Sequence, residues 1–264
     1  MAQRARDIGA PAGTPAAGDG SDHRRPFIDP PLEVDLSDVP AGELAGMRAA
    51  ADEIRECHRV LERGGINIVG ELLRGHDTFF EEDHYPTGDV LDRETGAQYY
   101  YHAHRGNALE HGHFHTFVRS RGFPDTLTGH APDGWDTRRE AKDPVVHLVA
   151  ISMDEWGFPK ALFATNAWVT SESWYSADDV EQLIDRFVVD HAYPSWPTNR
   201  WVTAMLRLFR PQVRALLRHR DQVLESWSRQ HGDADPLHDR TLEVTGWTLA
   251  SVDAQRHALD ALER

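Results

Sequence analysis

Five histidines lie close together between residues 99 and 118. Within each of two groups they recur at every second residue: His102 and His104, then His111, His113 and His115. Side chains of a β-strand alternate between its two faces, so the members of each group would share a face if the segment is extended. Imidazole-rich sites without thiolate suit zinc, copper or iron. The spacing therefore predicts a transition-metal site on a β-hairpin.

The relation between the two groups depends on the hairpin register. Residues 106–109 contain Gly and Asn, which predicts a short loop. With a loop of those four residues, His104 faces His111 and His102 faces His113, with Cβ atoms ~4.5–5.5 Å apart. All five imidazoles then line one surface. A slip of one residue would instead separate the groups onto opposite faces, although the row formed by the second group requires only a strand.

A row of imidazoles is unusual where a buried strand normally carries Val, Ile or Phe. Buried polar rings need hydrogen-bond partners, and adjacent imidazolium ions repel each other. A divalent ion removes both difficulties because it binds neutral imidazole and supplies the positive charge itself. We therefore expect a metal site. A proton-shuttling or anion-binding pocket without metal, or a surface patch of histidines with no role, are the alternatives.

Other residues complete the predicted site. His147 lies in the strongly apolar segment 145–150 and is a further candidate ligand. Two histidines from one strand and one from its neighbour make a three-histidine face with open positions, which supports catalysis. Glu110 and Glu155 are the candidate catalytic bases, and Glu172 is a further carboxylate that can act as ligand or base.

The histidine spacing resembles the ligand strands of two metal-binding families. Cupins carry His-x-His on a strand, then Glu, then a distant His; residues 111–113 or 113–115 match the start, but residues 116–121 contain no Glu. The α-type carbonic anhydrases carry His-x-His and a later His-Leu-Val strand, which is similar to residues 113–115 and 147–149 with a longer gap. Both resemblances cover a small fraction of the chain and imply ligands from neighbouring strands.

The elements that must position these side chains indicate an α+β fold. Apolar periodicity and capping signals predict helices at residues 42–63, 66–74, 177–191, 199–209, 211–230 and 252–262. Strands are expected at residues 98–105, 110–118, 145–153, 160–169 and 241–249, and the acidic stretch 75–96 as a loop with some helix. The expected architecture is a central antiparallel β-sheet of hairpins flanked by N-terminal and C-terminal helices.

Composition bounds the class of protein. Residues 1–25 have almost no large apolar side chains and predict a disordered segment, followed by a single α+β domain over residues 26–264 whose part 176–264 is helical. A net charge of −15 argues against nucleic acid as a partner. There is no apolar run near the ~18–20 residues of a membrane helix, and Cys57 is the only cysteine. We therefore expect a cytoplasmic protein without membrane contact.

These observations predict a His-ligated metalloenzyme that acts on a small molecule. The expected ligands are His111, His113, His115 and His147, with His102 and His104 as further ligands or supporting residues. The number of imidazoles, which would accommodate a second metal, favours a non-haem iron or copper oxidoreductase. A zinc hydrolase or lyase, with Glu110 or Glu155 as base, is the alternative. A non-catalytic metal- or small-ligand-binding protein is a further alternative, as is an interaction protein that uses the Trp- and Arg-rich helices 198–228.

Overall fold

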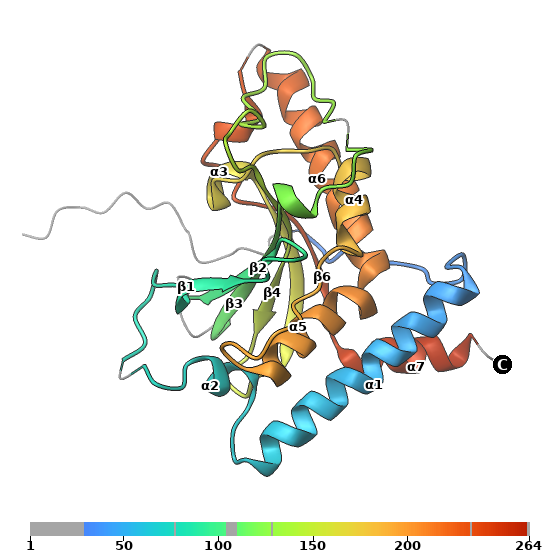
Figure 1. The fold of residues 1–264 in the computed structure, drawn as a ribbon. Helices are drawn as coiled ribbons and strands as arrows, with labels where there is room; N and C mark the ends of the chain where they lie inside the picture. The colour runs from blue at the N-terminus through green and yellow to red at the C-terminus, as the bar shows by residue number, and fades with distance from the viewer. Residues whose placement is uncertain (1–28, 77, 104–109, 128, 233, 263–264) are drawn as a thin grey trace, which may run out of the picture.

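Six antiparallel strands, arranged in sequence order, form the sheet that carries the histidines. In the computed structural model they are β1 (Tyr85–Leu91), β2 (Ala97–His102), β3 (Gly112–Arg119), β4 (Val145–Met153), β5 (Pro159–Thr165) and β6 (Val244–Leu249) (Figure 1). The structure describes residues 29–76, 78–103, 110–127, 129–232 and 234–262. The predicted disordered segment 1–25 lies outside these residues.

Helices precede and follow the sheet, which confirms the α+β prediction. The α-helices are α1 (Ala41–Arg63), α2 (Ile68–Leu72), α3 (Ala167–Thr170), α4 (Ala177–Ile184), α5 (Trp196–Leu208), α6 (Arg210–His231) and α7 (Val252–Ala261). Two short 3-10 helices, η1 (Ser120–Gly122) and η2 (Pro236–His238), lie between them. Among the residues described, none of the helices has the length and apolar character needed to span a membrane.

One face of the sheet packs against the helices and holds the core. Tyr101 pairs with Phe114 across β2 and β3, and the Phe114 ring lies 5.5 Å from the ring of Trp201 in α5. The buried Tyr99 hydroxyl donates a hydrogen bond of 2.5 Å to Oδ1 of Asn199, also in α5. Because side chains alternate along a strand, the residues between these core positions point to the opposite face. The histidines of β2 and β3 occupy that opposite face.

Several element boundaries differ from the sequence-based expectation. The stretch 75–96 contains the strand β1, because its residues pair with β2 despite their polar composition. The strand expected at 160–169 ends at Thr165, since Asn166 accepts a hydrogen bond from the backbone N–H of Ala167 and caps α3. The helix expected to run to residue 191 ends at residue 184. The helix expected from residue 199 begins at Trp196, and Ser195 is its N-cap.

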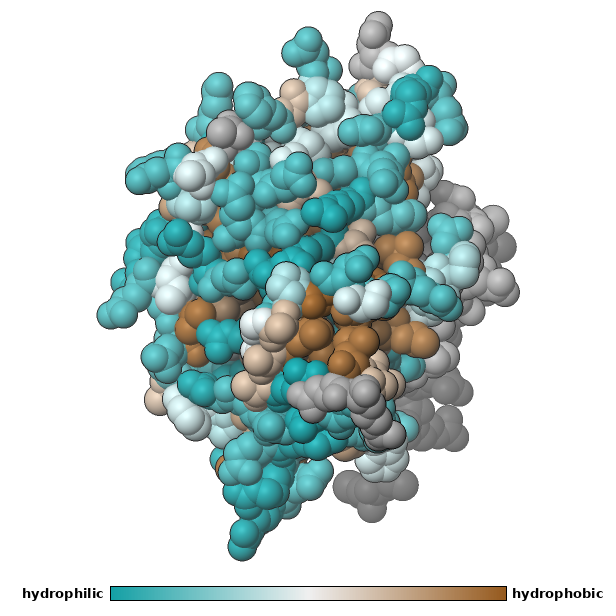
Figure 2. Space-filling view, turned by 90° about the vertical axis from the view of Figure 1, so that its right-hand side faces the viewer, coloured by the Kyte–Doolittle hydropathy of each residue, from teal (hydrophilic) through white to brown (hydrophobic). Residues whose placement is uncertain are grey.

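The surface is largely hydrophilic on the side that lies to the right in Figure 1. Seen face on, this side is covered mainly by hydrophilic residues, and its hydrophobic residues gather most densely near the middle (Figure 2). The formal net charge of the chain is −15. A negative field of this kind raises the local concentration of cationic solutes and lowers that of anionic ones.

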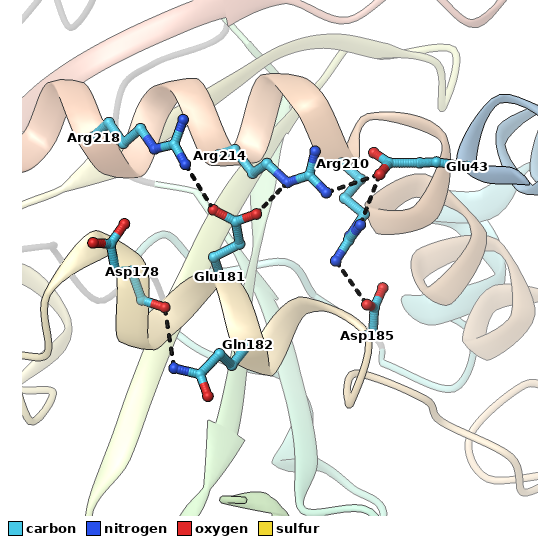
Figure 3. A network of polar contacts seen from close by, with 8 residues as sticks. All are labelled: Glu43, Asp178, Glu181, Gln182, Asp185, Arg210, Arg214 and Arg218. Carbon is cyan, nitrogen blue, oxygen red and sulfur yellow. Dashed lines mark hydrogen bonds and ion pairs between the residues drawn. The ribbon is translucent and has the colours of Figure 1, made fainter. Parts of the chain in front are cut away.

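The arginine-rich stretch of α6 joins three helices through ion pairs. Arg210 and Arg214 both approach Oε2 of Glu43 in α1 at 2.8 Å (Figure 3). Arg214 and Arg218 approach the two carboxylate oxygens of Glu181 in α4 at 2.6 and 3.1 Å (Figure 3). These arginines therefore serve contacts within the chain.

Replacing Glu181 with glutamine is expected to lower the free energy of unfolding by about 0.5–1 kcal/mol at low ionic strength, because two half-exposed ion pairs are lost. The difference should shrink in 1 M salt, which screens such pairs. Chemical denaturation at both salt concentrations measures it. Glu62→Gln, at an exposed position of α1, is the control, and an equal loss of stability in both variants would contradict the assignment.

Candidate metal centre

Three imidazoles meet on the sheet face opposite to the helical core. His102 pairs with His113 across β2 and β3, and their Nε2 atoms lie 2.8 Å apart. His115 lies two residues further along β3, and the three rings each offer a nitrogen within 4.8 Å of the others. His113 and His115 are buried, with exposed fractions of 0% and 1%. The observed pairing of His102 with His113 confirms the register expected from a four-residue loop.

The spacing of the three nitrogens suits a single metal ion. Zinc binds histidine nitrogen at about 2.0–2.1 Å, so two ligands of a tetrahedral ion lie about 3.3 Å apart. We call the cluster formed by His102, His113 and His115 the histidine triad. Two of its nitrogens lie 2.8 Å apart and all three lie within 4.8 Å of one another, a range that includes this value. No thiolate or carboxylate is needed to complete a group of three ligands. The histidine triad can therefore hold a metal ion.

Two of the three rings are oriented by a contact at Nδ1. Oε1 of the buried Glu110 lies 2.7 Å from Nδ1 of His113, and Nε2 of His147 lies 2.9 Å from Nδ1 of His115. An acceptor at Nδ1 holds the proton there, so that Nε2 is the nitrogen able to bind an ion. Burial lowers the pKa of His147 to about 3, with a smaller contribution from Arg220, so this ring is neutral and able to accept.

A bulge in β4 turns His147 toward the histidine triad. Thr116 pairs with Val149, but the next residue of β3, Phe117, pairs with His147, so that Leu148 is the extra residue. Strict alternation would have placed His147 on the same face as Val149 in the helical core. The bulge shifts it to the other face, which is how bulges commonly re-aim a side chain. The structure thus places His147 behind His115 as a hydrogen-bond partner, outside the group of three.

A buried carboxylate supports the bulged segment. Oε2 of Glu172 accepts a hydrogen bond of 2.6 Å from the backbone N–H of His147. Burial raises the pKa of Glu172 to about 7, and the charge of Arg220 opposes this shift. Its Oε1 is buried without a hydrogen-bond partner among the described residues. Glu172 therefore supports the backbone that carries His147. It is not one of the residues whose ligand atoms form the histidine triad.

Two predicted site residues, His111 and Glu155, lie apart from the histidine triad in the part of the chain that the structure describes. β3 begins after His111, whose Nδ1 lies 2.7 Å from the Tyr101 hydroxyl and whose ring stacks on Phe79 at 5.4 Å. The prediction that His111 continues the row is wrong, because that row required the strand to include it. Burial lowers the pKa of His111, and the charge of Glu155, exposed in the turn after β4, opposes this shift. His104 lies outside the described residues.

Two aromatic neighbours of the histidine triad are not among the site residues predicted from the sequence. The ring of Tyr100 lies 5.2 Å from that of His115 and 5.3 Å from that of His102. The ring of His84 stacks on Tyr100 at 3.6 Å and is edge-on to His102 at 5.6 Å. The position of Tyr100 could have been predicted from alternation along β2, because it precedes His102 by two residues and therefore shares its face. His84 approaches from the segment before β1, and no local pattern places it there.

Replacing Glu110 with glutamine is expected to weaken metal binding about tenfold, because the neutral amide is a poorer acceptor for Nδ1–H of His113. Competition with a chromophoric chelator measures the change. Glu155→Gln is the matched control, and its affinity should equal that of the wild type. Equal affinities for all three proteins would show that Glu110 does not support the ligand.

Comparison with known proteins gives a family but no characterised relative. No curated protein and no solved structure gives a significant match. A family model described as a domain of unknown function, DUF6969, matches residues 48–249. This range includes all of β1 to β6 and every residue of the histidine triad. The chain therefore belongs to the DUF6969 family.

Proposed function

We propose that this protein is a metal-dependent enzyme with a mononuclear three-histidine centre that acts on a small molecule. The proposal is carried by the convergence of His102, His113 and His115, whose ring nitrogens lie within 4.8 Å of one another. Three protein ligands leave positions on the ion for water or substrate, as in catalytic sites, whereas structural sites are closed by four.

Redox chemistry at iron or copper is the favoured activity. A metal-bound water used for hydrolysis is helped by a base within hydrogen-bond reach. Of the two predicted bases, Glu110 is engaged with Nδ1 of His113 and Glu155 is exposed in a turn. The histidine triad is surrounded by aromatic rings, with Phe163 5.2 Å from His113. The number of imidazoles suggested room for a second metal ion. Among the described residues there is no second group of three possible metal ligands, so the proposal is limited to one ion.

A zinc hydrolase or lyase is the second candidate. The pair formed by Glu110 and His113 has the carboxylate–histidine arrangement that commonly supports a zinc ligand. Zinc would act there as a Lewis acid or lower the pKa of its bound water. The identity of the metal separates this activity from the redox proposal.

Elemental analysis of tag-free protein purified without added metal tests the proposal. We expect close to one iron or copper ion per chain, with zinc pointing to the second candidate. The variant His113→Ala/His115→Ala should lose the ion and keep its circular dichroism spectrum. His257→Ala, at an exposed position of α7, is the control and should retain it. Wild-type protein that contains no metal and binds none of the three ions on titration would overturn the proposal.

A further inference from the structure

A cleft of about 660 Å³ is lined by the segment that joins α2 to β1 and by the first residues of β1. Its lining includes the imidazoles of His76 and His84, the carboxylates of Asp83 and Asp89, and the aromatic rings of Phe80 and Tyr85. Phe80 has an exposed fraction of 59%, unusual for so large an apolar side chain. No residue of the histidine triad lines the cleft, so its chemistry is separate from metal ligation.

One residue connects the cleft to the metal centre. His84 lines the cleft, and its ring is edge-on to that of His102 at 5.6 Å. The ring is held by stacking on Tyr100 at 3.6 Å and by a contact of 3.1 Å between its Nδ1 and Oδ1 of Asp89. The ring of His84 would therefore separate a molecule bound in the cleft from His102, a member of the histidine triad.

The charges around the cleft favour a cation. Asp83 is exposed at the cleft and follows two further exposed acids, Glu81 and Glu82. Asp89 accepts from Gln98 at 2.6 Å and lies 3.1 Å from Nδ1 of His84. The whole chain, with a formal net charge of −15, adds a field of the same sign. An ammonium group is attracted by the exposed carboxylate of Asp83 and by this field, whereas both repel a carboxylate.

The aromatic residue at the cleft adds a second point of recognition. A cation within about 6 Å of an aromatic ring centre gains from the electron-rich ring face, and an apolar substituent gains from contact with the ring. Phe80 presents such a ring to solvent beside the acidic residues. We propose that the cleft binds a small amine carrying an apolar or aromatic group. That this amine is the substrate of the metal centre rests on the proposed function; that it binds in the cleft does not.

Titration calorimetry with two probes of matched shape tests the proposal. 2-Phenylethylamine and 3-phenylpropionate differ mainly in the charged group, and we expect the amine to bind at least about tenfold more tightly at low ionic strength. Asp83→Asn should weaken binding of the amine about threefold, and Phe80→Ala should do so by a similar factor. Asp38→Asn, an exposed acid before α1, changes the net charge equally and should leave the affinity unchanged.

The same titration on metal-free His113→Ala/His115→Ala protein separates the two proposals. Retained binding of 2-phenylethylamine there would locate the amine in the cleft independently of the metal, even if the wild type proved to contain no metal. Equal affinity for the two probes, or an equal loss in Asp38→Asn and Asp83→Asn, would overturn the assignment of the cleft. Binding of the amine only to metal-loaded protein would also overturn it, because the amine would then be a ligand of the ion.

Discussion

Replacing Gly112 with alanine is expected to destabilise the protein by about 3 kcal/mol and to abolish retention of metal. A Cβ at this position would lie 2.6 Å from the backbone oxygen of His102 and 2.7 Å from the hydroxyl oxygen of Tyr101. The first atom is backbone and the second belongs to a buried ring, so neither can move without displacing β2. Displacement of β2 would separate His102 from His113, whose contact defines the histidine triad.

Denaturant unfolding and elemental analysis of the same preparation measure the two effects. Gly46→Ala is the matched control, because a Cβ there meets no atom within 4 Å and the residue lies inside α1. Alanine is the better helix former, so this control should gain about 0.5–1 kcal/mol. A Gly112→Ala protein that is as stable as the wild type and retains its metal would show that the strands approach less closely than described.

In metal-free protein, His147→Leu is expected to reduce the loss of stability in acid. The pKa of His147 is about 3 in the folded chain, because of burial first and Arg220 second, but about 6.5 in an unfolded chain. Between these values the unfolded state binds the additional proton, so stability rises with pH and is lost as pH falls below about 6.5. From pH 7 to pH 5 the wild type should lose about 2 kcal/mol more than the variant.

The same substitution is expected to weaken metal binding by roughly 10- to 100-fold, because leucine cannot accept from Nδ1–H of His115. Urea unfolding at several pH values and chelator competition at pH 7.5 give the two readouts. His257→Leu, at an exposed position, should keep both the acid sensitivity and the affinity of the wild type. A parallel loss of stability with pH in all three proteins would show that the buried ring is not the titrating group.

Local patterns were sufficient for much of the hairpin. A four-residue loop and strict alternation predicted that His102 faces His113, because both depend only on neighbours in sequence. Capping chemistry predicted the last helix in the same way: Ser251 accepts from the backbone N–H of Ala254 at the start of α7. Both successes concern contacts between residues that lie close together along the chain.

The remaining features depend on contacts between distant segments. The bulge at Leu148 is a property of the pairing between β3 and β4 and leaves no mark in an apolar run. The position of His84 follows from how the segment before β1 packs on Tyr100. His111 was misplaced because β3 begins after it and its ring contacts Tyr101 and Phe79, contacts that the sequence does not reveal. Alternation can assign a face only after such irregularities are known.

The order of the strands has a consequence for synthesis. Each strand pairs with its neighbour in sequence, and the histidine triad with its partner His147 is complete once β4 has been made. The helices α5 and α6, which cover the opposite face, are translated 43 or more residues after β4 ends, since β4 stops at Met153 and α5 starts at Trp196. Hairpins of neighbouring strands form early, and chains fold from the N-terminus as they emerge from the ribosome. The face that carries the histidine triad is therefore formed on the nascent chain before the hydrophobic side of the same sheet is covered.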